Sequence, residues 1–191
     1  MRELKSIEER ILDKALYLIG NSGTLNVPIR TIAKEANVNV SAVNYYFGTK
    51  EEMLKHTKEF FIENTTRIYS ILDEKDIEVE ERLLLFANEI MEHTIRYSGL
   101  SVMFKEAEKL KDEDEISRKI VEETKELHRK MELTLSEIIK DQSKIEYKYL
   151  IFISAILYPV EKMDNRDIME ALINDKDLRI DYIKHIINTL K

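Results

Sequence analysis

The chain is short of the residues that turn a polypeptide, since four glycines and two prolines serve 191 residues. Glycine supplies the positive φ angles of tight turns and proline fixes others, so this chain is poorly equipped for the many hairpins of a β-protein. Leu, Ile, Glu and Lys, which form helices well, are plentiful. The sequence therefore predicts an all-α protein of long helices joined by short connections.

The composition indicates a folded, soluble protein. Hydrophobic residues make up 43% of the chain and charged residues 35%, whereas a disordered chain has too few apolar residues to offset its entropy. Cysteine is absent, which excludes disulfides and thiolate chemistry and favours a reducing compartment. The uncharged and mostly apolar run 149–160 is too short to span a membrane, and the polar amino terminus has no signal-peptide region. We therefore expect a cytoplasmic protein.

Capping signals divide the first fifty residues into three helices. Ser6 with Glu9 is a capping box that begins a helix over 6–20, which the glycines near position 20 end. Pro28 suits the first turn of a second helix, 28–36. Asn39 or Ser41 caps a third helix that ends near Phe47.

The connection between the second and third helices is the informative one. Asn37 can adopt the left-handed conformation of a tight turn, and Val38 can fill the space between the helices. Two short helices around a three-residue turn are the geometry that places a recognition helix in the DNA major groove.

The rest of the chain predicts longer helices. Thr49 with Glu52 begins a fourth helix that continues to Leu72, followed by a loop over 73–81. Helices over 83–97 and 100–110 are separated near Gly99, and a long amphipathic helix follows the acids of 112–115 as far as Ile138. Two apolar helices, 149–160 and 180–190, complete the chain.

Charge is unevenly distributed. Residues 1–50 hold seven Lys or Arg against five acids, whereas 51–191 hold 23 against 32, within a net charge of −7. Because residues 1–50 are slightly basic and residues 51–191 are acidic, a nucleic-acid partner would be expected to bind the amino-terminal part.

The third helix has a polar face opposite its apolar one. Val43 and Phe47 share the inward face, which leaves Ser41, Asn44 and Tyr45 outside, where amides and hydroxyls can contact phosphates and base edges. Ordinary solvated positions would carry such residues too.

Lys50 stands in the first turn of the fourth helix, where its charge opposes the helix dipole. A nearby phosphate would explain it, although an exposed lysine there costs little.

The segment 6–55 resembles the DNA-binding head of the TetR family of transcriptional repressors. The resemblance rests on these residues in order: Ile32, Ala33, Val38, Tyr45, Tyr46, Phe47, Lys50, Glu51 and Leu54. It implies a helix-turn-helix domain over 1–55 and a helical effector-binding and dimerisation domain over 56–191. It also implies DNA contacts by Arg30, Ser41, Ala42, Asn44, Tyr45, Tyr46 and Lys50.

Three positions depart from the family pattern. Asn37 replaces a turn glycine, Pro28 replaces a threonine that contacts phosphate, and Asn44 replaces a tyrosine, which suggests a different base preference.

Two sets of residues in the carboxyl-terminal part are candidates for further binding. Met, aromatic and His side chains that could line a pocket for a small lipophilic or amphiphilic effector, or form plain core, are Phe86, Ile90, His93, Met103, Phe104, Leu127, His128, Met131 and Tyr149. Apolar residues expected at a homodimer interface are Phe152, Ile153, Ile156, Leu157, Ile180, Ile183 and Ile187.

Enzyme motifs are missing from the sequence. No HExxH, phosphate-binding glycine loop or GxSxG motif occurs, and no histidine follows a glutamate by three residues. Glu89 and His93 share a helix face, but carboxylates beside histidines are common on solvated faces. We expect a ligand-responsive DNA-binding repressor with no catalytic activity, cofactor or metal. The alternative is a helical small-molecule carrier or enzyme whose amino-terminal helices are only structural.

Overall fold

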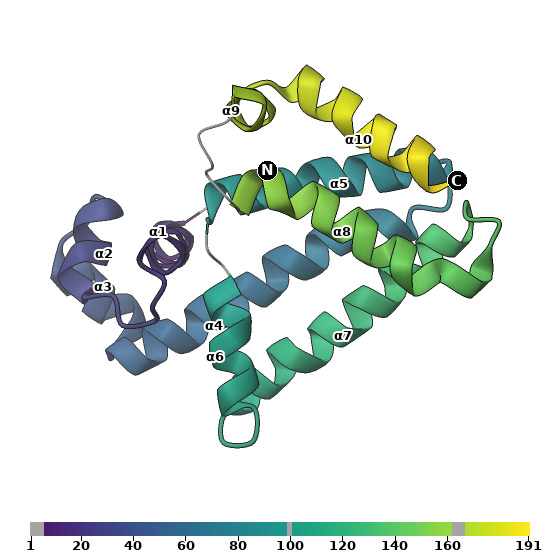
Figure 1. Ribbon diagram of the computed structural model, residues 1–191. Helices are drawn as coiled ribbons and strands as arrows, with labels where there is room; N and C mark the ends of the chain where they lie inside the picture. The colour runs from purple at the N-terminus through teal and green to yellow at the C-terminus, as the bar shows by residue number, and fades with distance from the viewer. Residues whose placement is uncertain (1–5, 99–100, 162–166) are drawn as a thin grey trace. The chain divides into compact units, whose positions relative to one another are not determined.

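The computed structural model describes residues 6–98, 101–161 and 167–191, and these ranges are helical with no strand among them. The α-helices are α1 (Ile7–Ser22), α2 (Ile29–Glu35), α3 (Val40–Phe47), α4 (Lys50–Tyr69), α5 (Val79–Arg96), α6 (Ser101–Leu110), α7 (Glu115–Ser136), α8 (Ile145–Glu161), α9 (Asp167–Asn174) and α10 (Lys176–Leu190) (Figure 1). Two 3-10 helices are η1 (Ser70–Asp73) and η2 (Gln142–Lys144). The all-α prediction is confirmed. None of the described helices combines the length and apolar character needed to cross a membrane.

The chain forms two compact units. The head unit comprises Met1–Thr65 and Tyr97–Thr124, and the body unit comprises Thr66–Arg96 and Lys125–Lys191. The long helices α4 and α7 each contribute to both units. The head unit therefore holds more than the expected 1–55, because α6 and the first turns of α7 pack with it. The division by function, into a DNA-binding and an effector-binding domain, stays a prediction.

In the head unit, α1 packs against α2, α3 and α6, and α2 packs against α3. Ser6 begins α1 by accepting a hydrogen bond from the Glu9 amide at 3.0 Å, as the capping box predicts. The helix continues to Ser22, and Gly23 ends it in the left-handed conformation. Gly20, which was expected to end the helix, lies inside it: a Cβ there would stand 2.1 Å from the Ser98 carbonyl oxygen. Its missing side chain therefore permits a close chain crossing.

The turn between α2 and α3 is a Schellman motif. Asn37 has a φ of 53°, its amide donates to the Lys34 carbonyl, and the Val38 amide donates to the Ala33 carbonyl at 2.9 Å. The half-buried Val38 side chain packs on the head core. Asn39 then caps α3 by accepting from the Ala42 amide at 2.7 Å. These contacts confirm the predicted left-handed Asn37 and choose Asn39 over Ser41 as the cap.

A partly buried ion pair joins α4 to the start of α7 within the head unit. The Lys58 ammonium donates to Asp114 at 2.6 Å and to the Ser117 hydroxyl at 3.0 Å. Burial alone raises the pKa of Asp114, but the hydrogen bonds from Lys58 and Ser117 and the Lys58 charge outweigh burial and lower the pKa to about 2. Asp114 also accepts from the Ser117 amide, so it caps α7.

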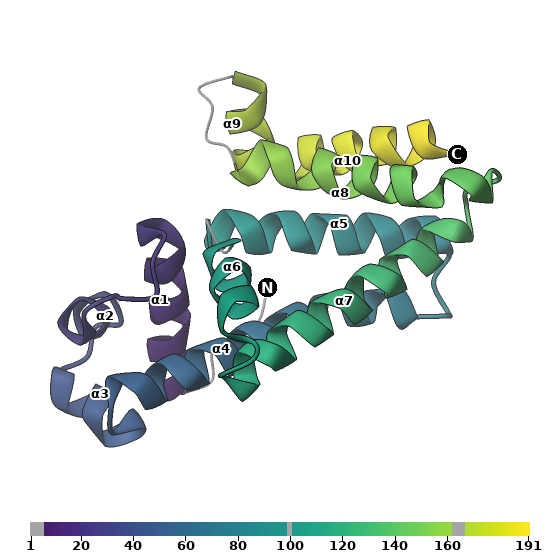
Figure 2. The same cartoon turned by 60° about the horizontal axis from the view of Figure 1, so that its bottom comes forward.

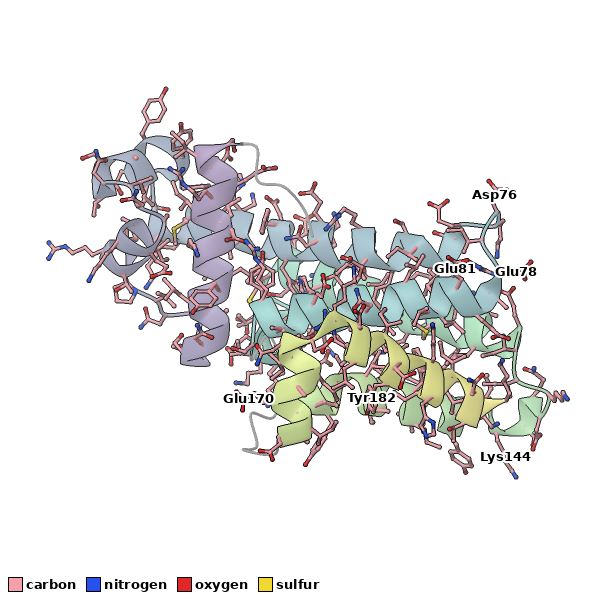
Figure 3. All side chains as sticks on the ribbon, turned by 90° about the horizontal axis from the view of Figure 1, so that it is seen from above. Asp76, Glu78, Glu81, Lys144, Glu170 and Tyr182 are labelled. Carbon is pink, nitrogen blue, oxygen red and sulfur yellow. The ribbon has the colours of Figure 1, made fainter. Side chains whose placement is uncertain are left out.

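In the body unit, α5 packs against α8 and α10, and α8 packs against α10 (Figure 2). Pro159 stands inside α8 and has no amide hydrogen, so the Ala155 carbonyl four residues earlier lacks its usual helical donor. The Tyr182 hydroxyl of α10 donates to that carbonyl at 2.7 Å (Figure 3). The proline thus creates an acceptor that joins α8 to α10.

Two arginines of the body unit bind helix ends. Arg82 of α5 donates to the Leu72 carbonyl of η1 at 2.8 Å and to Glu137 at 2.9 Å. Arg179 of α10 donates to Glu92 of α5 at 2.9 Å and to the Leu172 carbonyl of α9 at 3.0 Å. Both arginines are buried, so each replaces water as the donor to carbonyls that helix ends leave open.

Several boundaries differ from those expected. α5 begins at Val79 rather than 83, α8 at Ile145 rather than 149, and α10 at Lys176 rather than 180, because their polar first turns carry no apolar stripe. α9 was not predicted, since its eight residues bury only Met169 and Leu172. The expected break near Gly99 lies outside the described residues.

The positive φ of Asn37 makes the turn sensitive to side-chain type. Asn37→Ala should lower the free energy of unfolding by about 1 kcal/mol, because a Cβ without a compensating polar group is strained in this conformation. Asn37→Gly should be at least as stable as the wild type. Chemical denaturation measures both, with Asn188→Ala on the exposed face of α10 as the control. Equal stability of Asn37→Ala and the wild type would contradict the role given to this turn.

Candidate nucleic-acid interface

The exposed face of α3 is the candidate interface. Val43 and Phe47 are 1% and 5% exposed, so they fix one side of the helix in the head core. On the other side Ser41, Asn44 and Tyr45 are exposed, and the Tyr45 ring is the most open at 83%. This is the arrangement that the sequence predicted. A helix held by one face and polar on the other can present hydroxyl and amide groups to a groove.

Tyr45 lies at the outer end of a row of aromatic rings in contact with one another. Its ring meets that of Tyr46 edge-on, with centroids 5.3 Å apart. Tyr46 lies 6.3 Å from Phe47, and Phe47 lies 5.7 Å from the His56 ring of α4. The exposed tyrosine is therefore connected to the buried anchor by ring contacts, which lowers the entropy it would lose on binding.

Cationic side chains lie on the elements that flank α3. Arg30 in the first turn of α2 is exposed, and Lys50 begins α4. The Lys50 ammonium donates a hydrogen bond to the side-chain oxygen of Asn26 in the loop before α2. Ala42 is half-buried, and Tyr46 is 39% exposed.

Sequence reasoning missed two residues of this surface. Val40 begins α3 and is 37% exposed, although an apolar residue beside Val43 reads as core. Exposed apolar groups on a recognition helix can contact the thymine methyl group. Asn26 was missed because a single loop asparagine carries no periodic signal, and its contact with Lys50 spans 24 positions of the sequence.

Comparison with known proteins assigns the head. The model of the tetR family of bacterial regulatory proteins matches residues 11–57, which include α2, α3 and the turn between them. Residues 11–57 are therefore similar to the segment that defines the tetR family of bacterial regulatory proteins.

Individual relatives agree with this assignment. The chain is 43% identical over 47 residues to the HTH-type transcriptional regulator BetI of Agrobacterium fabrum, a stretch that covers 25% of this chain and 23% of BetI. The match therefore spans about a quarter of the curated relative's length.

Solved structures share the fold over nearly the whole chain. A TetR transcriptional regulator from Legionella pneumophila has a TM-score of 0.65 at 16% identity and covers 100% of both chains. A regulator-like protein from Saccharomonospora viridis, solved in complex with choline, has a TM-score of 0.59 at 15% identity and covers 95% of this chain and 93% of that one. At such identities the likeness is one of fold.

The candidate effector residues fall into both units. Phe86, Ile90, Leu127, Met131 and Tyr149 are buried in the body core. Met103 and Phe104 belong to the head unit instead, where the Phe104 ring lies 5.1 Å from that of Phe61. The sequence grouped all of them because periodicity does not report which core a helix joins.

Polar groups among the body residues have displaced pKa values. Burial and then the charges of Arg67 and Arg96 together lower the pKa of His93 to about 4. Burial also lowers the pKa of His128, whose ring lies 5.6 Å from that of Tyr149. Burial and then the charge of Glu132 raise the pKa of Tyr149 to about 12. At neutral pH both histidines and Tyr149 are therefore uncharged.

No group of three or more His, Asp or Glu side chains in the described part of the chain is arranged to hold a metal ion.

The residues expected at a dimer interface need correction. Phe152, Ile156, Ile183 and Ile187 are at most 3% exposed, so they form the core of a single subunit. Ile153, Leu157 and Ile180 are half-buried. The large apolar residues that α8 exposes lie on the opposite side of the helix from Phe152 and Ile156. They are Tyr147 at 66%, Leu150 at 55%, Ile151 at 56% and Tyr158 at 45%.

The His93 pKa gives a pH dependence with a definite sign. The folded-state pKa near 4 lies below the ordinary 6.5, so the unfolded chain takes up the proton first as the pH falls. Stability should be fully present above pH 6.5 and fall by up to about 3 kcal/mol as the pH approaches 4. In His93→Leu the free energy of unfolding should change much less between pH 6.5 and pH 4, as measured by urea unfolding at each pH.

The control for this experiment is His185→Leu, on the exposed side of α10. This variant should show the same dependence of stability on pH as the wild type. The stability that the Asp114 ion pair contributes is lost in a separate range, as the pH falls below the ordinary Asp pKa of 3.8. An unchanged profile in His93→Leu would contradict the assignment.

Proposed function

We propose that this protein is a transcriptional regulator, acting as a repressor, that binds a pseudo-palindromic DNA operator as a homodimer and is released by a small lipophilic or amphiphilic effector. The observation that carries the proposal is the α3 face: Tyr45, Asn44 and Ser41 are exposed while Val43 and Phe47 hold the helix, within the stretch that matches the family model. A role on chromosomal DNA would place the protein in the cytoplasm.

The contacts divide into two kinds. Asn44 can read a base edge, since its amide offers a donor and an acceptor that match adenine. Ser41, Tyr45 and Tyr46 carry hydroxyls suited to phosphate or base contacts, while Arg30 and Lys50 supply charge to the backbone. Base contacts specify the operator, and phosphate contacts provide affinity that depends on salt.

A carrier or an enzyme with a purely structural head is the competing function. Such a function gives no reason for Tyr45 to be 83% exposed at the end of a row of aromatic rings. Binding to a DNA duplex does give a reason, because the exposed ring and hydroxyl would then contact the DNA. The relatives found by comparison are regulators.

Replacing individual residues of the interface should have separable effects on DNA binding. Lys50→Ala should weaken binding to every sequence and lower the salt slope by about one, because one phosphate contact is lost. Asn44→Ala should relax discrimination at one base pair, and Tyr45→Ala should weaken operator binding. Gel shifts against the upstream region of the protein's own gene measure all three.

The control for these variants is Lys184→Ala on the exposed side of α10. It should leave the salt slope unchanged. If all three head variants bind as the wild type does while circular dichroism shows an intact fold, the interface has been misassigned.

The dimer proposal rests on the exposed stripe of α8. Tyr147, Leu150, Ile151 and Tyr158 recur at helical spacing with Ser154 between them, so they line one side of the helix. Four large apolar residues in a row are more than a monomer usually exposes. Packing this stripe against its counterpart would form a two-fold interface, which a palindromic operator matches.

Leu150→Asp should convert the protein to monomers, since a charge in the middle of the stripe would be buried without a partner. Light scattering at micromolar concentration should then give about 22.6 kDa, against twice that mass for the wild type. Leu133→Asp is the matched control, because Leu133 of α7 is equally exposed, at 54%, but lies outside the stripe. A wild-type mass of 22.6 kDa would exclude the homodimer.

The effector proposal rests on the chemistry of the body unit. Its core combines apolar and aromatic residues with uncharged His93, His128 and Tyr149, which suits a small amphiphile. Arg67 and Arg96 lie close enough to His93 for their charges to lower its pKa, and guanidinium groups are suited to binding an anion. We infer that the effector has an acidic rather than a cationic head group, unlike the choline bound by the Saccharomonospora viridis protein.

A medium-chain fatty acid should therefore raise the melting temperature and weaken operator binding by about 5 to 150 fold, a typical allosteric coupling. Choline should do neither. Thermal shift and gel shift on the same samples make the comparison, and His93→Leu should reduce the response to the acid. Release of the operator by choline and not by the acid would contradict the inferred head-group charge.

A further inference from the structure

We propose that Asn26 is a positioning residue: it holds the Lys50 ammonium in place and shares its DNA phosphate. This inference rests on the proposed DNA-binding function. It assigns a part in DNA binding to the loop between α1 and α2, for which the sequence analysis predicted no role.

The loop fixes the Asn26 backbone before any DNA is present. The backbone amide of Asn26 donates to the Thr24 hydroxyl at 3.1 Å. The backbone amide of Val27 donates to the Leu25 carbonyl at 3.0 Å, which places Asn26 at the centre of a γ-turn. Val27 on its carboxyl side is 5% exposed and anchors the turn in the head core. The exposed Asn26 side chain therefore starts from a defined backbone position.

The partner of Lys50 leaves its charge available. Other lysines of the head unit pair with carboxylates: Lys58 with Asp114, and Lys14 with Glu35 at 3.7 Å. Lys50 instead donates to the neutral amide oxygen of Asn26. An amide acceptor restricts the ammonium without neutralising it, so the positive charge can still attract a phosphate.

The remaining half of the Asn26 amide suits the same anion. An asparagine amide has an acceptor oxygen and a nitrogen with two N–H donors. When Oδ1 of Asn26 accepts from Lys50, the side-chain nitrogen Nδ2 can donate to an oxygen of the phosphate that Lys50 contacts. Lys50 and Asn26 would thus bind one phosphate from two elements, the start of α4 and the α1–α2 loop.

A double-mutant cycle tests this on the full-length protein with a random-sequence DNA duplex, since phosphate contacts act on any sequence. Asn26→Ala should weaken binding by about fivefold, the loss of one hydrogen bond of about 1 kcal/mol. In the Lys50→Ala background the same change should weaken binding clearly less, because only the hydrogen bond from Asn26 to the phosphate remains to be lost. The salt slope of Asn26→Ala should lie between those of the wild type and Lys50→Ala.

Asn26→Asp provides a second test, because it keeps the shape and the acceptor but adds a negative charge. It should weaken binding more than Asn26→Ala and lower the salt slope by about one, since the carboxylate neutralises Lys50. Asn188→Ala, at an exposed asparagine of α10, is the matched control and should bind like the wild type.

The outcomes separate this inference from the function beneath it. If Lys50→Ala lowers the salt slope but Asn26→Ala changes nothing, or weakens binding equally in both backgrounds, Asn26 does not position Lys50. If the wild type fails to bind duplex DNA, or Lys50→Ala leaves the slope unchanged, the proposed interface itself is wrong.

Discussion

The position of α3 depends on the burial of Val43 and Phe47. A helix of eight residues is too short to be stable alone in water, because the cost of nucleation exceeds what a few backbone hydrogen bonds return. Its stability therefore comes from packing, and these two side chains supply it. The Schellman turn at Asn37 and the Asn39 cap then set where the helix begins. With one face held and both ends defined, the opposite face can be polar without loss of the fold.

The body unit solves a related problem with buried polar groups. Helix ends leave carbonyls without donors, and in a packed core no water reaches them. Arg82 and Arg179 donate to such carbonyls and to carboxylates on neighbouring helices. Tyr182 does the same for the carbonyl that Pro159 leaves open. Each of these side chains both satisfies an acceptor and fixes the register of two helices, so the bundle of the body unit depends on directional bonds as well as apolar area.

How much the sequence predicts depends on the range of the interactions involved. The starts of α1, α3 and α4 were predicted closely because Ser6, Asn39 and Thr49 act on amides three residues away. The assignments that failed depend on contacts distant in sequence. An almost wholly apolar helix such as α8 does not reveal which side its own subunit covers, so Phe152 was placed at an interface although it is fully buried. Asn26 and Lys50, 24 positions apart, show no shared pattern at all.

Whether the surface of this acidic protein can bind a phosphate depends more on which side chains its lysines and arginines pair with than on its net charge. The chain carries a net charge of −7, which would repel a polyanion if it were spread evenly. Screening confines surface charges to an effective range of about 8 to 10 Å at physiological salt, so the groups nearest the DNA dominate. Around α3 those groups are Arg30 and Lys50, and Lys50 is paired with an amide rather than an acid. Lysines that meet carboxylates, such as Lys58, stabilise the fold and add little to the field outside. A protein can therefore be acidic as a whole and still offer a phosphate-binding surface, provided that the cations near its recognition helix have neutral partners, as Lys50 has at the start of α4, while lysines further along the same helix, such as Lys58, pair with carboxylates.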